Sequence, residues 1–482
     1  MTPAQASDLV HAPLADWAQV RGQAVAIAAA GRQLDFAGLQ QAMLQRAAVL
    51  QAQSAPALVP VDTQQAALDQ VLDFLGIVAS GRCAAVGDPD WPAAVQQAVR
   101  AALGSAPCTP AAVQPGSAFY TGFTSGSSGR PKGFRRDHQS WSHSFRACVQ
   151  EFGAAAGARI LVPGSLSHSL FLFGTLLGLW SGAGVVLQQP FSAAATLECL
   201  RREAIPCLVA VPSQLLLLLE LAALRQLAPL PELRLVMVSG ARWPRQHSAA
   251  LQALFPAARI IEFYGASELS FVAWTEADAT LPDAVVGRPF ANVQVQIRPL
   301  PGAAADDPVG LIYVRSPMVF TDYVAAAADD TACLRDGDWL SVRDLGYLDA
   351  QGRLCLVGRQ NRMIVTRAKK LFPEELESVL QAHPAIARAS VQGASDALRG
   401  QSVQALIQWS AQAATPLPTA AELGRWCRGR LQAYKVPRQF FVCDHWPQTV
   451  SGKTDHRALE QALQRHLLAP RSEEGSWLHR LR

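Results

Sequence analysis

The chain has few charged residues and no cysteine spacing of the kind that binds zinc or forms a redox pair. Only 17% of its 482 residues are charged, and 42 Lys plus Arg against 38 Asp plus Glu leave a formal net charge of +4. So small a basic excess argues against nucleic acid as the main partner. The nine cysteines are scattered without a C-x-x-C, which is typical of reduced thiols in the cytoplasm.

Targeting and linker segments are missing as well. No basic stretch followed by an apolar one opens the sequence, so we expect no signal peptide. There is no Gly/Ser-rich tether and no internal repeat. Half of the residues are hydrophobic, which excludes a disordered chain or a small disulfide-bonded scaffold, and the length suggests more than one domain.

One long uncharged stretch could either span a membrane or form part of the protein core. Residues 160–197 contain no Asp, Glu, Lys or Arg, which is long enough to span a bilayer. However, Ser-Gly-Ala-Gly at 181–184 interrupts the stretch, after a Leu/Phe-rich segment at 169–180 and before Val-Val-Leu at 185–187. We therefore expect a buried helix, a turn and a core strand, with no integral membrane association; membrane insertion is the alternative.

Strands and helices alternate through the middle of the chain. The pattern predicts strands at 159–162, 184–188, 207–211, 235–238 and 259–263, and helices at 169–180, 194–203, 212–224 and 244–254. Such alternation indicates parallel sheets flanked by helices, an α/β large N-terminal domain. After about residue 284, the strand-like segments 292–298 and 310–315 predict a small antiparallel or β-barrel-like subdomain.

The C-terminal part reads as a small α+β domain. Its predicted elements are helices at 373–383 and 420–433, strands at 390–392, 403–409 and 440–443, and a final helix. We place the boundary near 358–363, with a large domain at 1–358 and a small domain at 359–482 that turns about a hinge.

Residues 119–133, FYTGFTSGSSGRPKG, are the most informative segment. An apolar lead-in meets a loop rich in glycine and hydroxyl groups, and Lys132 closes it. Glycines let backbone N–H groups approach phosphate oxygens, hydroxyls donate hydrogen bonds, and lysine supplies positive charge. The spacing differs from the G-x-x-x-x-G-K-[ST] of P-loop NTPases.

This loop resembles the phosphate loop of the adenylate-forming superfamily, which includes acyl-CoA synthetases, adenylation domains and luciferases. Further segments resemble that family in the same order: 261–268 (IEFYGASE), 343–347 (RDLGY), 358–364, 371–377, 434–437 and 447–453. Three positions in or beside two of these segments depart from the family pattern. Ser267 replaces a threonine, and Val342-Arg343 replaces Thr-Gly before Asp344.

The resemblance implies a two-step ligation. A carboxylate attacks the α-phosphate of ATP to give an acyl-adenylate, and a thiol then displaces AMP. Because the first step brings two anions together, it depends on positioning and positive charge. ATP, Mg²⁺ and CoA are the cofactors implied, and the expected function is activation of an apolar fatty or aryl acid to its acyl-CoA.

The resemblance also implies roles for the ATP-binding residues. Lys132 would lie near the β- and γ-phosphates, and Glu268 would hold Mg²⁺; the alternatives are a surface lysine and an exposed glutamate at a helix start. The remaining phosphate-loop residues are Thr124, Ser125, Gly126, Ser127, Ser128 and Gly129. In the Tyr264-Gly265 segment, Tyr264 would pack on adenine, and Ser267 would donate to the α-phosphate.

Three more residues would act on the ribose and the reacting groups. Asp344 would accept hydrogen bonds from the ribose hydroxyls, and Arg359 would reach the ribose or a phosphate; a turn aspartate and a surface arginine are the alternatives. Lys453 of the small domain would enter the site during adenylation and bridge the α-phosphate and the carboxylate; its alternative is a mobile surface lysine.

The acid would bind beside His168, which occupies the place of the family's gate residue; a helix-start histidine satisfied by backbone is the alternative. Gly240 and Ala241 would border the acyl pocket. Residues 165–173 contain no carboxylate that could pair with an amino-acid ammonium, so the sequence favours an apolar acid and leaves fatty and aryl acids open.

Two departures from the family pattern bear on the thiol acceptor. Asn361 replaces the usual hinge Asp or Lys, and Ala368 replaces a glycine that lets the backbone approach the pantetheine arm. Both departures bear on thioester formation. A phosphopantetheine carrier protein is a separate alternative to CoA as the acceptor. Basic residues of the small domain could meet CoA phosphates or an acidic carrier, or form a solvated face: Arg367, Lys369, Lys370, Arg425, Arg428, Arg430 and Lys435.

A catalytically silent ligand-binding homologue is a further alternative. The joint presence of Lys132, Glu268, Asp344 and Lys453 argues against it. The sequence does not specify the acid, the oligomeric state or the pathway.

Overall fold

The computed structural model describes residues 7–53, 55–104, 106, 108, 112–125, 131–301, 304, 306–324, 331–366, 369–396, 400–449, 454–468 and 477–481. The chain divides into two compact units. The large unit comprises Met1–Gln296, Tyr313–Val342 and Gly352–Leu354, and the small unit comprises Ile297–Ile312, Arg343–Gln351 and Cys355–Arg482. The domain boundary at residue 358 stays a prediction.

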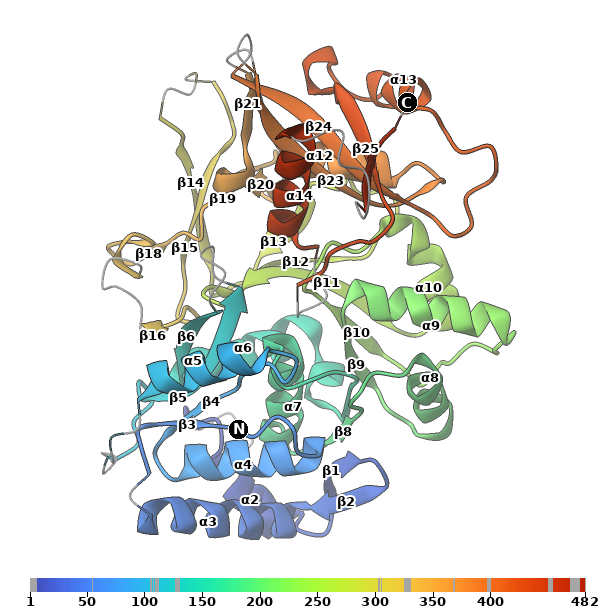
Figure 1. The fold of residues 1–482 in the computed structure, drawn as a ribbon. Coiled ribbons are helices and arrows are strands. Elements are labelled where there is room, and N and C mark those ends of the chain that lie inside the picture. The colour runs from blue at the N-terminus through green and yellow to red at the C-terminus, as the bar shows by residue number, and fades with distance from the viewer. Residues whose placement is uncertain are drawn as a thin grey trace. The chain divides into compact units, whose positions relative to one another are not determined.

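A mainly parallel sheet forms the middle of the large unit (Figure 1). Its parallel strands lie in the order β1, β8, β7, β9, β10 and β11, with β2 antiparallel at one end and β12 and β13 antiparallel at the other. The bounds are β1 Val25–Ala29, β2 Arg32–Asp35, β7 Ile160–Val162, β8 Val185–Leu187, β9 Cys207–Ala210, β10 Leu235–Val238, β11 Arg259–Ala266, β12 Ser270–Glu276 and β13 Val285–Pro289.

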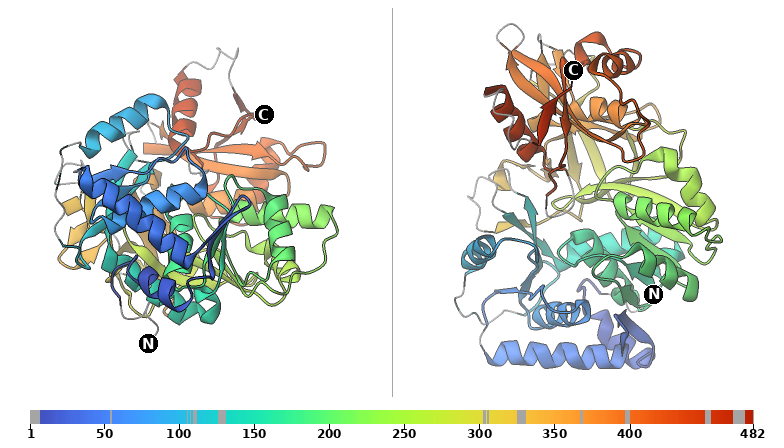
Figure 2. Two further views of the ribbon diagram at one scale, coloured as in Figure 1. Left: turned by 90° about the horizontal axis from the view of Figure 1, so that it is seen from below. Right: turned by 45° about the vertical axis from the view of Figure 1, so that its right-hand side comes forward.

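Helices cover both faces of this sheet, as the alternation predicts (Figures 1 and 2). On one face, α8 (Ala193–Arg202), α9 (Pro212–Leu224) and α10 (Ser248–Leu254) share a core with Val236 and Val238. On the other face, Cys148 of α6 (His138–Phe152) contacts Met237, and α7 (Ser169–Trp180) brings Gly174 against Val209. The helix predicted at 244–254 begins instead with a 3-10 turn at Arg245–His247.

The long uncharged stretch forms β7, α7 and β8, the buried strand–helix–turn–strand segment that the sequence favours. Within the described part of the chain, we find no helix with both the length and the apolar character needed to cross a bilayer.

A second sheet of the large unit is not apparent from the sequence pattern. It has the strand order β16, β6, β5, β4, β3, in which β3 to β5 are parallel and β6 and β16 are antiparallel. Its bounds are β3 Leu58–Pro60, β4 Cys83–Ala85, β5 Ala118–Ser125, β6 Pro131–Asp137 and β16 Asp322–Val324. The helices in this part of the sequence are α2 Pro13–Val20, α3 Phe36–Ala52, α4 Ala67–Ala79 and α5 Ala93–Leu103.

The segments predicted to be antiparallel form β14 (Gln294–Pro299) and β15 (Gly310–Arg315), which pair with each other. Strand β15 also pairs antiparallel with β18 (Trp339–Leu340) and β19 (Asp344–Leu348). Strand β18 pairs with β17 (Arg335–Asp336), and β20 (Leu354–Arg359) follows β19 in the chain.

The small unit carries a sheet with helices on both faces. The core on one face joins α12 (Pro373–Gln381) and α13 (Ala420–Arg428) to the sheet, and that on the other joins α14 (His456–Leu468) to Leu406 and Phe441. Helix α13 ends at Arg428, earlier than predicted, and a 3-10 turn follows at Ala433–Lys435. The strands are β21 Ile364–Thr366, β22 Lys369–Leu371, β23 Ile386–Asp396, β24 Gly400–Trp409, β25 Gln439–Cys443 and β26 Leu478–Arg480.

A buried histidine pair predicts acid sensitivity of the large unit. His138 accepts a hydrogen bond from the Val10 N–H through Nδ1 and stacks on Phe119, and the His11 ring lies 5.5 Å away. Burial lowers the pKa of His138 to about 3 and that of His11 to about 4, from 6.5. The unfolded chain therefore binds more protons than the folded one below pH 6.5, and stability is lost as the pH falls toward 4.

We expect the melting temperature to fall steeply between pH 6.5 and 4.5, because each such histidine costs about 1.4 kcal/mol for every pH unit. In His138→Gln, the slope of melting temperature against pH should be shallower. Replacement of the exposed His445 by glutamine is the matched control and should keep the wild-type slope. Equal slopes for His138→Gln and wild type would contradict the assignment.

Candidate active site

The predicted phosphate loop joins two paired strands. Strands β5 and β6 are antiparallel, with Thr124 opposite Lys132 and Ser125 opposite Pro131, so both ends of the loop are held in one hairpin. Four of the predicted phosphate-binding residues lie outside the described residues: Gly126, Ser127, Ser128 and Gly129.

Glu268 lies in the turn between β11 and β12 and is only 8% exposed. It is therefore neither at a helix start nor on the surface, which removes the alternative that the sequence left open. The hydroxyl of Tyr323 in β16 donates a hydrogen bond of 2.6 Å to its Oε1. The main-chain carbonyl of Glu268 accepts a second bond, of 2.8 Å, from the Phe320 N–H. The carboxylate is thus fixed by the segment around β16.

Lys132 and Glu268 converge on the same tyrosine. The Nζ of Lys132 lies 5.5 Å from the ring centroid of Tyr323, within the range of a cation–π contact. Strand β16 is placed here by pairing with β6, and Asp322 accepts a hydrogen bond of 2.6 Å from Nε of Arg135. The lysine of the predicted phosphate loop and a buried carboxylate therefore lie around one side chain.

Arg136 is a buried residue of this cluster that sequence reasoning missed. Its guanidinium donates to the carbonyl oxygens of Ser267, at 2.9 Å, and Met318, and also to the hydroxyl of Ser140. Burial lowers its pKa to about 10, with nearby carboxylates such as Glu268 opposing the shift, so the side chain stays charged at neutral pH. The only hint in the sequence is a basic residue three positions after Gly133, next to the predicted loop.

Tyr264 and Gly265 belong to the end of β11, and Ser267 follows in the turn. Gly265 stands at a close approach of the two strands, because a Cβ built there would lie 2.0 Å from the carbonyl oxygen of Ser270. Any larger residue at this position would clash with β12, so the hairpin that carries Ser267 and Glu268 requires glycine there.

His168 and Gly240 lie next to each other. His168 caps α7, and its Nδ1 accepts a hydrogen bond of 3.4 Å from the Leu170 N–H. It is thus a helix-start histidine bonded to backbone through Nδ1, and its gate role stays a prediction. The neutral ring then carries its proton on Nε2. A Cβ on Gly240 would lie 3.8 Å from this Nε2, so the N–H edge faces the Gly240 segment, where Ala241 follows in an exposed turn.

The sheet topology explains why His168 and Gly240 lie close together. His168, Gly240 and Tyr264 come after or at the carboxyl ends of β7, β10 and β11, which are parallel strands separated only by β9. In open α/β sheets, ligands bind at this edge. The fold therefore gathers the predicted acid-binding and adenine-binding residues at one edge of the sheet.

Gly240→Ala should weaken binding of the acid. Gly240 has φ +91°, a region that L-residues avoid, and the new Cβ would lie 3.3 Å from Val211 Cγ1. We expect a loss of about 1–2 kcal/mol in stability and a KM for the acid raised more than the KM for ATP. Gly352→Ala is the matched control, since φ is +72° there and nothing lies within 4 Å of the added Cβ. An equal effect on KM for the acid in both variants would refute the placement.

In the small unit, Asp344 and Arg359 form an ion pair in which Nε of Arg359 donates to Oδ1 of Asp344 at 3.1 Å. The Asp344 side chain is 5% exposed and that of Arg359 is 63% exposed. Arg343 has φ +65°, the left-handed region in which the family's glycine would be unstrained. The backbone thus keeps the turn that a glycine would allow.

The predicted hinge is anchored to the small unit. Arg362 donates to Glu374 at 2.8 Å and to Glu377 at 2.6 Å, both in α12, while Asn361 is exposed in the same 3-10 turn as Arg362. Ala368 and Lys453 lie outside the described residues.

A magnesium ion fits the residues around Glu268. Mg²⁺ prefers one or two carboxylates together with phosphate oxygens and keeps several waters. Glu268 offers one buried carboxylate, bonded to the Tyr323 hydroxyl, and Lys132 of the predicted phosphate loop lies against the same ring. Over the described ranges, no group of three or more His, Cys, Asp and Glu side chains forms a metal cage.

Residues 24–324 match the AMP-binding enzyme family, and residues 375–453 match the AMP-binding enzyme C-terminal domain. The chain belongs to the AMP-binding enzymes.

Relatives and solved structures of this family agree with that assignment. The acyl–CoA ligase YhfT of Bacillus subtilis, described as uncharacterized, is 38% identical over 344 residues, which are 71% of this chain and 68% of that protein. The 2-succinylbenzoate–CoA ligase of the same organism is 29% identical over 350 residues, 72% of this chain and 69% of that protein. The predictions of the family and of an AMP-forming ligase are confirmed.

Two solved structures share the fold over nearly the whole chain. The o-succinylbenzoate CoA synthetase MenE of Bacillus subtilis, in complex with its acyl-adenylate, has a TM-score of 0.81 at 23% identity, covering 93% of this chain and 97% of that one. The amide bond synthetase McbA of Marinactinospora thermotolerans has a TM-score of 0.80 at 26% identity, covering 94% and 99%. The predicted α/β large domain with an α+β small domain is confirmed.

Proposed function

We propose that this AMP-binding enzyme joins an apolar carboxylic acid to CoA through an acyl-adenylate, consuming ATP and releasing AMP and pyrophosphate. The observation that carries the proposal is the convergence of Lys132 and the buried Glu268 on Tyr323. ATP, Mg²⁺ and CoA are the cofactors, which agrees with its acyl-CoA ligase relatives.

In the first half-reaction, a carboxylate oxygen bonds to the α-phosphorus, and the bridging oxygen leaves with pyrophosphate. The Lys132 ammonium would offset charge on the β- and γ-phosphates. Glu268 would hold Mg²⁺, which neutralises phosphate charge when it is bound. Ser267, whose carbonyl Arg136 fixes, would donate its hydroxyl to the α-phosphate. Lys453 would bridge the two reacting anions.

The acid would lie beside His168 and Gly240, which are in contact with each other. Because Nδ1 of His168 accepts from backbone, its Nε2–H is the donor that can orient the substrate carboxylate. No Asp or Glu occurs in residues 165–173, and the Leu- and Phe-rich helix α7 follows directly. An apolar acid therefore fits better than an amino acid, whose ammonium would lack a partner.

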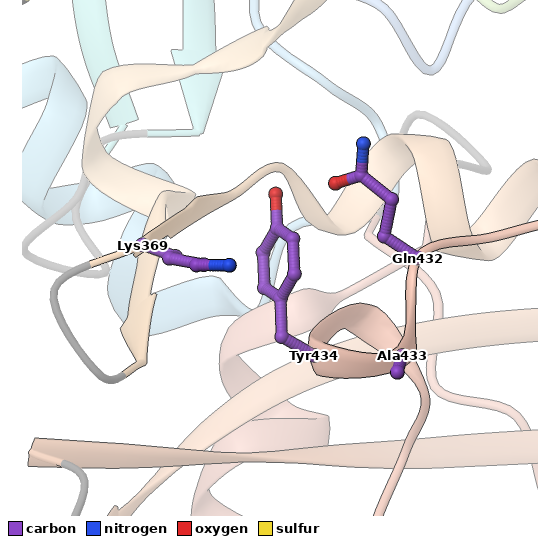
Figure 3. Close-up of a pocket in the computed structure, with 4 residues that line it drawn as sticks. All are labelled: Lys369, Gln432, Ala433 and Tyr434. Atoms are coloured by element: carbon purple, nitrogen blue, oxygen red, sulfur yellow. The ribbon is translucent and has the colours of Figure 1, made fainter.

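In the second half-reaction, the thiol sulfur bonds to the acyl carbon, AMP leaves, and the thiol proton passes to solvent. The small unit offers a pocket of about 470 Å³ lined by Lys369, Gln432, Ala433 and Tyr434. Figure 3 shows the Lys369 side chain reaching toward the Tyr434 ring, and Nζ lies 4.9 Å from its centroid. A cation beside an aromatic face suits a phosphate-bearing group such as the nucleotide of CoA.

The distribution of lysine supports a role for these cations. Only five of the 42 basic residues are lysine: Lys132, Lys369, Lys370, Lys435 and Lys453. All five lie in the phosphate loop or in the segments of the small domain expected to meet ATP or the acceptor. Of these, Lys435 is held by both oxygens of Glu375, at 2.8 and 2.6 Å, which fixes the turn that presents Tyr434.

The test is a screen of straight-chain and aryl acids, including 2-succinylbenzoate, by pyrophosphate release with and without CoA. Acid-dependent exchange of labelled pyrophosphate into ATP, followed by AMP and acyl-CoA in the complete mixture, is the expected result. Absence of exchange with every acid, for a protein that is folded by circular dichroism, would overturn the proposal.

The acceptor is tested by competition. We expect thioester on free CoA; thioester on a phosphopantetheine carrier protein but none on CoA would select the carrier. The likeness to an amide bond synthetase makes an amine the second candidate, which amide formation from ammonia or a small amine would reveal. The scattered cysteines support a cytoplasmic location for the reaction.

A further inference from the structure

Tyr323 is the residue on which the two ATP-binding groups meet, yet it has no role so far. It comes from β16, nearly 200 positions after the phosphate loop, and reaches the cluster because β16 pairs with β6. Its hydroxyl bonds to Glu268, and its ring faces the Lys132 ammonium. It therefore touches both groups at once.

The surroundings of Tyr323 are built to keep it in place. Its N–H donates to Thr331 Oγ1 at 3.1 Å, and its ring packs edge-on against Phe320 at 5.0 Å. Arg335 donates to the carbonyl oxygens of Phe320 and Thr321. A side chain whose backbone and ring are both fixed can orient its hydroxyl with little loss of entropy on ligand binding.

The hydroxyl has a chemical consequence for the carboxylate. A phenol that donates to Oε1 occupies that oxygen and leaves Oε2 as the better donor toward a cation. Mg²⁺ demands near-octahedral geometry and suits a carboxylate bound through one oxygen. Partners that orient a metal-binding carboxylate typically change metal affinity by 10–100-fold when they are removed.

We propose that Tyr323 is a positioning residue for ATP-bound Mg²⁺: its hydroxyl holds Glu268 so that one carboxylate oxygen receives the cation, while its ring holds Lys132 at the phosphates. The inference rests on the proposed function, because it assumes that Glu268 and Lys132 bind magnesium and ATP. It adds a residue that neither the phosphate loop nor the Tyr264–Glu268 segment contains.

The test measures binding of α,β-methylene-ATP, which cannot release pyrophosphate, by calorimetry in EDTA and across a magnesium series. In wild type, Mg²⁺ should tighten binding of the analogue. In Tyr323→Phe, the Mg²⁺ concentration for half-maximal tightening should rise by about 10–100-fold, with binding in EDTA nearly unchanged because the ring remains. Tyr323→Leu, which also removes the ring, should weaken binding in EDTA as well.

Tyr313→Phe in β15 is the matched control for loss of a phenol hydroxyl and should titrate like wild type. An unchanged magnesium midpoint in Tyr323→Phe would overturn the inference, as would equal weakening in EDTA and in magnesium, which indicates general damage to the site. Failure of wild type to bind the analogue under any condition would overturn the proposed function itself and this inference with it.

Discussion

Replacing Lys453 by alanine should stop adenylate formation and spare thioester formation. The first half-reaction brings a carboxylate onto a phosphate, and we expect the loss of a bridging ammonium to slow it by about 10²–10³-fold, as for other groups that stabilise developing charge. The second half-reaction starts from a neutral acyl carbon that is already activated. Formation of acyl-CoA from a chemically prepared acyl-adenylate should therefore stay near the wild-type rate.

The two half-reactions are measured separately. Exchange of labelled pyrophosphate into ATP reports the first, and consumption of synthetic acyl-adenylate by CoA reports the second. Arg465→Ala is the control, because it removes an exposed cation from α14 of the same small unit. Lys453→Arg keeps the charge with a different shape, and its partial recovery of exchange would show that charge matters. Equal losses in both half-reactions of Lys453→Ala would contradict a lysine that serves adenylation alone.

The sequence was informative for sites whose residues are contiguous in the chain. The loop at 119–133 and the turn at 261–268 each put their chemistry within a few positions, and the structure shows both as hairpins between paired strands. The β–α alternation from 159 to 263 predicted the parallel sheet correctly, because each buried strand is a short apolar run between amphipathic or apolar helices.

The sequence did not predict contacts between residues from distant segments of the chain. Tyr323 reaches Glu268 only through the pairing of β16 with β6, and Arg136 of β6 reaches the carbonyl of Met318 in the turn before β16. No local periodicity signals such contacts, since they depend on which strands become neighbours. Strands β3 and β4 have three residues each, too few to show a pattern, which is why the second sheet was missed.

The ends of helix α13 (Ala420–Arg428) show that some helix boundaries can be predicted from the local sequence and others cannot. Thr419 and Glu422 form a capping box that starts α13, a signal readable in the sequence. The end of α13 was placed too late, because Gly429 and the following 3-10 turn interrupt an otherwise helix-compatible composition. Burial and contacts likewise were needed to show that Glu268 is not exposed and that His168 caps a helix through Nδ1, and the gate role of His168 stays a prediction.

Glu268→Gln should abolish magnesium-dependent activation with little effect on folding. Glutamine has nearly the same shape, and its amide oxygen can still accept the Tyr323 hydroxyl, so the hairpin between β11 and β12 should keep its structure. The negative charge that would hold Mg²⁺ is lost, however. We expect pyrophosphate exchange to fall by at least about 10²-fold, with a melting temperature close to that of wild type.

Two further substitutions separate charge from position at Glu268. Glu268→Asp keeps the carboxylate but shortens the side chain by one methylene, which withdraws it from Tyr323; its activity should lie between glutamine and wild type and should rise with added Mg²⁺. Glu276→Gln, at an exposed position in β12, is the control for loss of one carboxylate from the same hairpin and should leave exchange unchanged. If Glu268→Gln retained exchange within about threefold of wild type, the buried carboxylate would serve only the hairpin, and the magnesium site would have to be sought elsewhere in the protein.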